Sequence, residues 1–217
     1  MTFLEAINAV LRRLREDEVV STNSTDYSKL IGDFVNQAIY DCERAWDWNC
    51  LKDTITITTA ASTAKYNFHN SDVKIIEAIN NTKDWCMKVI PADYQALLDY
   101  NSSLTPDSPY YYSFEGKSGD YSQIKLTPTP TGVESIVFYV IKYTPEKDLD
   151  GTGDAENIII PALPVVLNAY AQAVSERGED GGIGINEADA RYRQALADAV
   201  SMDVALNHPM EHAWHVI

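Results

Sequence analysis

Three of the four histidines in this 217-residue sequence lie within its last ten residues, at spacings of four and three. On a continuous helix, His208, His212 and His215 would share one face, and their imidazole nitrogens could bind zinc. Pro209 disfavours a helix that continues through His208, and chain ends are commonly mobile. We therefore predict no metal site at these histidines. We interpret the segment as a tail that is solvated or contacts a partner.

The segment from Asp148 to Glu156 alternates acidic residues with others, as a calcium loop does. The EF-hand pattern fails because Thr152 occupies the third ligand position and Ile159 occupies the position of the closing glutamate. We interpret the segment as a solvated acidic turn and predict no calcium site.

Motifs for enzymatic chemistry are otherwise missing. The sequence contains no glycine-rich phosphate loop, no nucleophile elbow and no paired Cys-x-x-Cys. Carboxylates are numerous, but the sequence does not identify a pair that folding would bring together. We expect a non-enzymatic protein without a cofactor. The alternative is a glycan-cleaving enzyme with a carboxylate pair in a β region, which would need a deep pocket and a carboxyl of raised pKa.

A run of tyrosines provides a candidate contact surface. Tyr110, Tyr111 and Tyr112 are consecutive and Phe114 is close by, so aromatic rings project from both faces of one predicted strand. Either both faces are buried in a two-sided core, or one face is an aromatic patch that meets another subunit, where tyrosine is enriched.

The chain ends with apolar residues, which provide a second candidate contact. Trp214, His215, Val216 and Ile217 contribute little to a core unless the tail is docked. They either dock within the chain or insert into a groove of a partner. Both interpretations remain open.

Residues with helical periodicity occupy both ends of the chain. Thr2 and Glu5 form a capping box, which predicts that a helix begins at Phe3. Asn186 is an expected N-cap of the last helix, whose apolar stripe is narrow and rich in alanine. The four helices expected at the chain ends cover residues 3–14, 30–46, about 161–177 and 186–207.

The middle of the chain changes to period two. Thr54 to Thr59 alternates hydroxyl and apolar side chains, which is typical of a half-exposed strand. Residues 91–100 are expected to form a short helix that begins at a proline. The predicted strands cover residues 54–59, 65–68, 73–79, 85–90, 110–114, 123–126 and 135–143.

These elements predict an α+β protein. Helices from the N- and C-terminal segments form a four-helix body, and a mostly antiparallel β region is inserted between its halves. The expected domains are the N-terminal helices (1–49), the inserted β domain (50–145), the C-terminal helices (146–207) and a C-terminal arm (208–217).

Charge and cysteine content restrict the function further. The net charge is −15, and residues 148–217 carry 12 acidic side chains against three arginines. Such a surface repels nucleic acid. Either it only keeps the protein soluble, or it forms a wall past which nucleic acid moves without binding. Cys42, Cys50 and Cys86 are expected to be reduced thiols in the core of a protein that is made in a cytosol. We expect no signal peptide and no membrane-spanning helix.

A succession of short motifs resembles one known family. Ile124 to Pro130 places a leucine-x-proline-x-proline turn before the strand at Ile136, and Ile160-Pro161 opens the first C-terminal helix. At the N-terminal side, a helix ends in Trp46-Asp47-Trp48 before the first strand. The chain resembles the head-to-tail adaptor, or connector, proteins of tailed bacteriophages, of the tail tubular protein A and tail accessory factor type.

The resemblance implies a virion structural protein of the neck, made in the host cytoplasm. It implies a ring, usually of twelve copies, that joins the portal to tail or nozzle proteins. The ring extends the channel through which viral DNA passes without specific binding. It implies that residues 208–217 are a portal-facing arm with Trp214, Val216 and Ile217 as anchors. Besides the glycan-cleaving enzyme, the alternative is another virion interaction protein, such as one whose acidic surface mimics nucleic acid.

Overall fold

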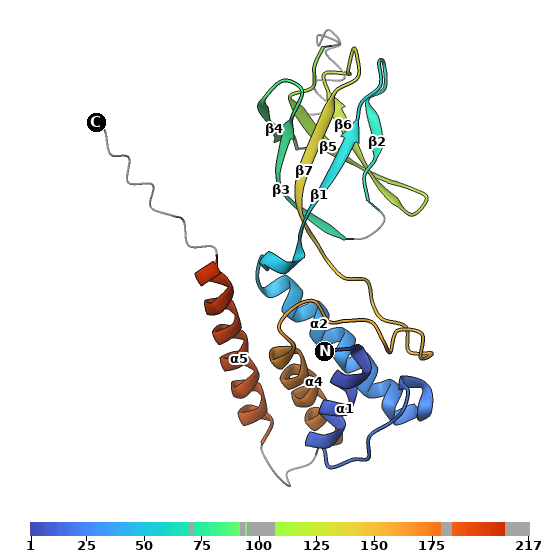
Figure 1. Ribbon diagram of the computed structural model, residues 1–217, viewed down its shortest axis with the longest axis vertical. Coiled ribbons are helices and arrows are strands. Elements are labelled where there is room, and N and C mark those ends of the chain that lie inside the picture. Colours follow the sequence, from blue (N-terminus) through green and yellow to red (C-terminus); the bar gives the residue numbers. More distant parts are fainter. Residues whose placement is uncertain (70–71, 92–93, 95–106, 179–183, 207–217) are drawn as a thin grey trace, which may run out of the picture. The chain divides into compact units, whose positions relative to one another are not determined.

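A computed structural model describes residues 1–69, 72–91, 94, 107–178 and 184–206. The chain forms two compact units, which we call the helical unit (Met1–Leu51 and Glu146–Ile217) and the β unit (Lys52–Pro145). The predicted α+β class is confirmed, with N- and C-terminal helices on either side of an inserted β region in the sequence (Figure 1). None of the described helices is both long and apolar enough to cross a membrane.

Both N-terminal helices begin at capped positions. The first begins where its capping box predicts, and the second begins at Asp26, before the predicted range of 30–46. Helix α1 (Phe3–Arg13) has the capping box: the Glu5 amide donates to Thr2 Oγ1 and the Thr2 amide donates to the Glu5 carboxylate. Helix α2 (Asp26–Ala45) is capped by Thr25. Single-turn 3₁₀ segments precede and follow α2, and these are η1 (Thr22–Ser24) and η2 (Asn49–Leu51).

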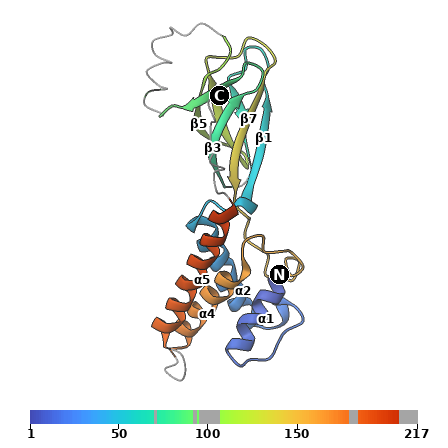
Figure 2. The same ribbon diagram turned by 60° about the vertical axis from the view of Figure 1, so that its left-hand side comes forward.

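The two C-terminal helices also lie where the periodicity predicts them. Helix α4 (Ala162–Arg177) ends at Gly178, whose φ of +60° is the left-handed C-cap conformation that glycine adopts without strain. Helix α5 (Ile185–Leu206) begins one residue before the predicted N-cap. Helix α4 packs against α1, α2 and α5, and it lies beside α5 along their length (Figure 2).

Hydrogen bonds between distant parts of the sequence connect the two halves of the helical unit. The amide of Phe3 donates to the carbonyl of Glu156 at 2.8 Å. The side chain of Asn36 on α2 bonds to both backbone groups of Lys147, donating at 2.9 Å and accepting at 3.1 Å. Because both groups are buried, each bond satisfies a polar atom that water cannot reach. The helical unit therefore depends on residues more than 100 positions apart in the sequence.

The β unit is a mostly antiparallel sheet of seven strands. Its order is β1-β7-β3-β4-β5-β6-β2, and the pair β4–β5 is parallel while the other pairs are antiparallel. The predicted helix at residues 91–100 lies almost entirely outside the described residues. The strands are β1 (Lys52–Thr58), β2 (Lys65–Asn67), β3 (Val73–Asn80), β4 (Trp85–Val89), β5 (Tyr111–Ser118), β6 (Tyr121–Thr127) and β7 (Ser135–Lys142).

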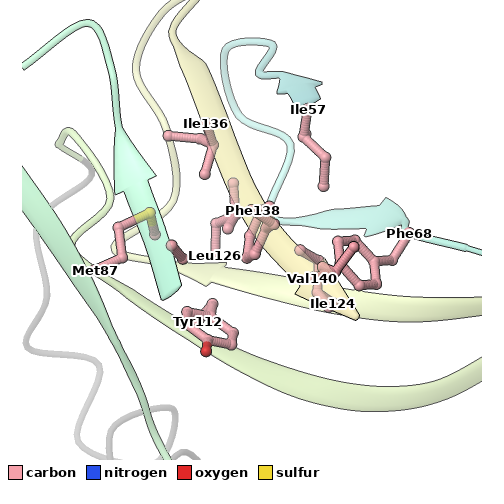
Figure 3. Close-up of a cluster of buried hydrophobic side chains, with 10 residues drawn as sticks. Ile57, Phe68, Met87, Tyr112, Ile124, Leu126, Ile136, Phe138 and Val140 are labelled. Atoms are coloured by element: carbon pink, nitrogen blue, oxygen red, sulfur yellow. The ribbon is translucent and has the colours of Figure 1, made fainter. Parts of the chain in front are cut away.

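The core of the β unit is built around Phe138 of β7, which has no exposed surface. Its ring makes edge contacts with Phe68 and Tyr112, at centroid distances of 5.0 and 5.4 Å. Figure 3 shows these rings among aliphatic side chains from the other strands. Alternate residues of each strand point into this core, which explains the period-two pattern of the sequence.

The prediction that all three cysteines are core thiols is wrong for two of them. Cys42 on α2 is buried, but Cys50 and Cys86 are exposed. In β4, Met87 points into the core, so its neighbour Cys86 points out. Cys50 lies in the short turn η2, outside the periodic part of α2.

Candidate interaction surfaces

A hydrogen-bonded aspartate fixes the C-terminal end of α5. Asp203 is 9% exposed, and its carboxylate accepts hydrogen bonds from Trp46 Nε1 at 3.0 Å and from the Asn49 amide at 3.2 Å. Asn49 Nδ2 also donates to the Asp203 carbonyl at 3.2 Å. Asp203 thus holds α5 to the end of α2, three residues before α5 ends. The segment after α5 therefore starts from a fixed point of the helical unit.

Helices α4 and α5 form an apolar groove of about 520 Å³. Leu163 of α4 and Met202 of α5 are 57% and 73% exposed, which is unusual for large hydrophobic side chains this close together. Polar groups stand at the α5 side, where Asp198 accepts a hydrogen bond from the Gln194 amide at 2.8 Å. An apolar groove with a few polar groups beside it is suited to binding a side chain of another protein.

The exposed face of α2 presents an aromatic ring and a cation. Tyr40 is 52% exposed, and the guanidinium of Arg44 lies 3.5 Å from the centroid of its ring. Stacking on a guanidinium limits the freedom of both side chains, so less entropy is lost when they enter an interface. Tyrosine and arginine are also the residue types that carry much of the binding energy in protein interfaces. We call Tyr40 and Arg44 the α2 knob.

The structure places the three consecutive tyrosines in different environments. Tyr112 points into the core of the β unit and is 7% exposed. Tyr110 is 36% exposed, and its ring contacts that of Tyr111 at 4.6 Å. Phe114 is 52% exposed, and the pairing of β5 with β6 changes register directly after it. Tyr110 and Phe114 are therefore the accessible aromatic rings of this strand, and a role in partner binding stays a prediction.

The outer face of the β unit has a shallow hollow of about 470 Å³. Tyr139 of β7 and Ile76 of β3 line it, at 43% and 50% exposure, together with the charged residues Lys52, Asp53 and Glu77. Ile76 lies at a β-bulge between Ile75 and Glu77, which turns it away from the core.

The acidic segment at residues 148–156 uses its carboxylates to hold the chain together. Asp154 accepts hydrogen bonds from the amide and the hydroxyl of Thr22, and Glu156 pairs with Lys147 Nζ at 2.5 Å. Hydrogen bonds from Thr152 lower the pKa of Asp150, so this carboxyl is ionised and unsuited to act as a general acid. Among the described residues, no three histidine, cysteine or acidic side chains form a group that could hold a metal ion.

The predicted portal-binding residues Trp214, His215, Val216 and Ile217 lie outside the described residues, as do the histidines considered for zinc binding. Their roles stay predictions.

Sequence reasoning did not identify Asp203, the groove or the α2 knob. A signal for Asp203 exists, because it continues the stripe of Ala188, Tyr192, Ala195 and Ala199 at a spacing of four. An acidic residue on an apolar stripe must have a buried partner, and the tryptophan and asparagine that end α2 provide it. The groove has no such signal, because it depends on how α4 and α5 are paired.

The comparisons with known proteins identify one family. No curated protein matches the chain. A family model described as SU10 adaptor protein matches residues 1–211, which include both helical segments and the whole β insertion. The chain therefore belongs to the SU10 adaptor protein family, whose members are structural proteins of bacteriophage virions.

Proposed function

We propose that this protein forms a ring in the neck of the virion, where it joins the portal to the tail and extends the channel for viral DNA. Assembly in the host cytoplasm from about twelve copies would follow from the resemblance to head-to-tail adaptors of the tail tubular protein A type. The observation that carries this proposal is the match of the family model to residues 1–211, both helical segments and the β insertion included.

The surfaces of the helical unit support a role in assembly. A ring of identical subunits needs two different complementary faces on each subunit, so that the contact repeats by rotation until the ring closes. The apolar groove and the α2 knob are two such surfaces with different chemistry.

The proposed contact with the portal is the C-terminal arm, residues 208–217. Asp203 supports this assignment, because it fixes the end of the helix from which the arm departs. Trp214, Val216 and Ile217 are the proposed anchors, with His215 between them. The exposed aromatic rings of β5 are a candidate contact for a tail protein or a neighbouring subunit.

The charge of the chain supports passage of DNA without binding. The net charge of −15 gives a surface that repels phosphates, so DNA inside the ring would not be retained.

Electron microscopy of the purified protein, alone and mixed with the portal, tests the ring. We expect closed rings with a central channel that stack on the portal. Particles that remain single subunits in both samples would contradict the proposal.

A truncation tests the arm. Removal of residues 208–217 should abolish portal binding while the helical and β units stay folded, which circular dichroism would verify. A matched control is the full chain with Trp214→Phe, which retains an aromatic anchor and should bind. Portal binding that is unchanged by the truncation would exclude the arm as the contact.

A further inference from the structure

We propose that the groove between α4 and α5 binds the α2 knob of a second copy of this chain. The proposal rests on the proposed ring, and it names the lateral contact by which one subunit would hold the next. Its basis is that one surface of the helical unit exposes apolar side chains beside a carboxylate, and the other exposes an aromatic ring beside a cation.

The groove suits an occupant that is apolar and carries a cation. It has one cation of its own, Arg191, but this guanidinium already pairs with Glu187 at 2.8 Å. Its apolar part exposes Leu163 and Met202, which a flat aromatic ring would cover. The carboxylate of Asp198 lies on the α5 side, where its described hydrogen bond comes from a neutral amide. A guanidinium brought to this carboxylate would form a charge-assisted hydrogen bond, which is stronger than a bond between neutral groups.

The α2 knob has this combination of groups. The ring of Tyr40 can cover the apolar part of the groove while the guanidinium of Arg44, stacked 3.5 Å from the ring centroid, faces Asp198. Among the large hydrophobic residues exposed in the described part of the helical unit, Tyr40 is the aromatic one. An aromatic ring with an adjacent arginine is therefore the most suitable complement that the described helices offer.

Within one chain, the two surfaces lie on different sides of the helical unit. Ala38 and Cys42, two residues before and after Tyr40, are buried, so Tyr40 points away from the helices that pack on α2. On α5, Tyr192 lies close to Cys42 of α2, and burial together with this nearby thiol raises the pKa of the phenol. Met202 lies ten residues further along, about a quarter of a turn away from Tyr192. The part of the groove at Met202 is therefore turned away from the face of α5 that contacts α2.

A contact between two different faces has a consequence for assembly. Each bound copy still presents one empty groove and one unused knob, so the contact can repeat from copy to copy. A contact of groove with groove would instead stop at a dimer. A contact between two different surfaces is therefore of the kind that the proposed ring requires.

Cysteine crosslinking in assembled rings tests the contact directly. The background is the full chain with Cys50→Ser and Cys86→Ser, because these native thiols are exposed, whereas Cys42 is buried. Gln37→Cys places a thiol one turn from Tyr40, and Ala199→Cys places one in the groove, with the knob itself unchanged. After addition of a short bismaleimide, the chain with both substitutions should give a ladder of covalent oligomers.

The controls identify which faces meet. Each single substitution should give no ladder, and Gln37→Cys combined with Val204→Cys should give none either, because Val204 is exposed on α5 outside the groove. A dimer formed by Ala199→Cys alone would overturn the proposal, because it would show groove meeting groove.

Charge reversal provides a second test. Arg44→Glu and Asp198→Arg should each prevent ring formation, and the two substitutions together in one chain should restore it. Rings that form normally in both single variants, or a missing ladder in rings visible by electron microscopy, would overturn the knob-and-groove contact and leave the proposed ring intact. If the unmodified chain forms no ring with the portal, both proposals fail.

Discussion

The helical unit and the β unit are held together in different ways. The helical unit combines residues 1–51 with residues from 146 onward, and buried bonds such as Asn36–Lys147 and Trp46–Asp203 join the two parts. The β unit is one continuous stretch, residues 52–145, with a core of its own around Phe138. The comparison indicates that the β unit can fold independently, whereas the helical unit needs both ends of the chain.

The largest expected effect comes from separating the two parts of the helical unit. Residues 1–51 alone should be unfolded, because α1 and α2 lose the buried face of α4 and short isolated helices are marginal in water. Residues 52–145 alone should fold. NMR spectra of the two fragments would check both statements. The amide resonances of residues 52–145 should be widely dispersed, and those of residues 1–51 should fall in the narrow range of an unfolded chain. A folded 1–51 fragment would contradict the claim that the helical unit needs both ends of the chain.

The next effect concerns the core of the β unit. Phe138→Ala should lower the free energy of unfolding of the β unit by about 3–5 kcal/mol, because it leaves a cavity between Phe68 and Tyr112. Urea unfolding of the fragment 52–145 measures this change. The neighbouring substitution Tyr139→Ala, at a 43% exposed position, is the control and should cost about 0.5 kcal/mol or less. Equal losses in the two variants would contradict the assigned core.

A smaller loss is expected at the bond between the two parts of the helical unit. Asp203→Ala leaves Trp46 Nε1 and the Asn49 amide without their acceptor, which should cost the helical unit about 1–3 kcal/mol. Asp198→Ala, on the same helix but at its exposed groove, should change stability by about 0.5 kcal/mol or less. Urea unfolding of the full chain, followed by tryptophan fluorescence, distinguishes the two. A loss at Asp198 as large as that at Asp203 would contradict the role assigned to Asp203 in joining α5 to the end of α2.

The smallest effect is chemical and reports on the opening of the helical unit. Burial raises the pKa of Cys42 from the ordinary thiol value of 9.0 to about 12, so the folded state favours the neutral thiol. This contribution to stability is complete below pH 9.0 and is lost as pH rises toward 12. At about pH 8, iodoacetamide should label Cys50 and Cys86 and leave Cys42 unmodified. Labelling of Cys42 as fast as Cys50, measured by peptide mass, would contradict its burial.

The sequence contained most of the fold because the local signals agree with one another. The capping box of Thr2 and Glu5 and the alternation in β1 each identify an element from neighbouring residues alone. The strand order and the parallel β4–β5 pair could not be predicted, because they depend on contacts between distant segments.

The interaction surfaces were less accessible to sequence reasoning for the same reason. Tyr112 and Phe114 lie on the same side of one strand, yet Tyr112 is buried and Phe114 is exposed, which alternation alone does not predict. The groove arises only when α4 and α5 pack side by side. Cys86 could have been predicted from the strand alternation. Cysteine is usually buried, but in β4 this position points away from the core, so Cys86 is exposed.

The central claim is that the protein acts by assembling on the portal. Native mass measurement of the full chain mixed with the portal tests it most directly, because the mass gives the number of copies bound. We expect a single complex with a fixed number of copies, about twelve. This complex should not form with the variants Arg44→Glu and Asp198→Arg. A complex with one or two copies, or no complex, would contradict it.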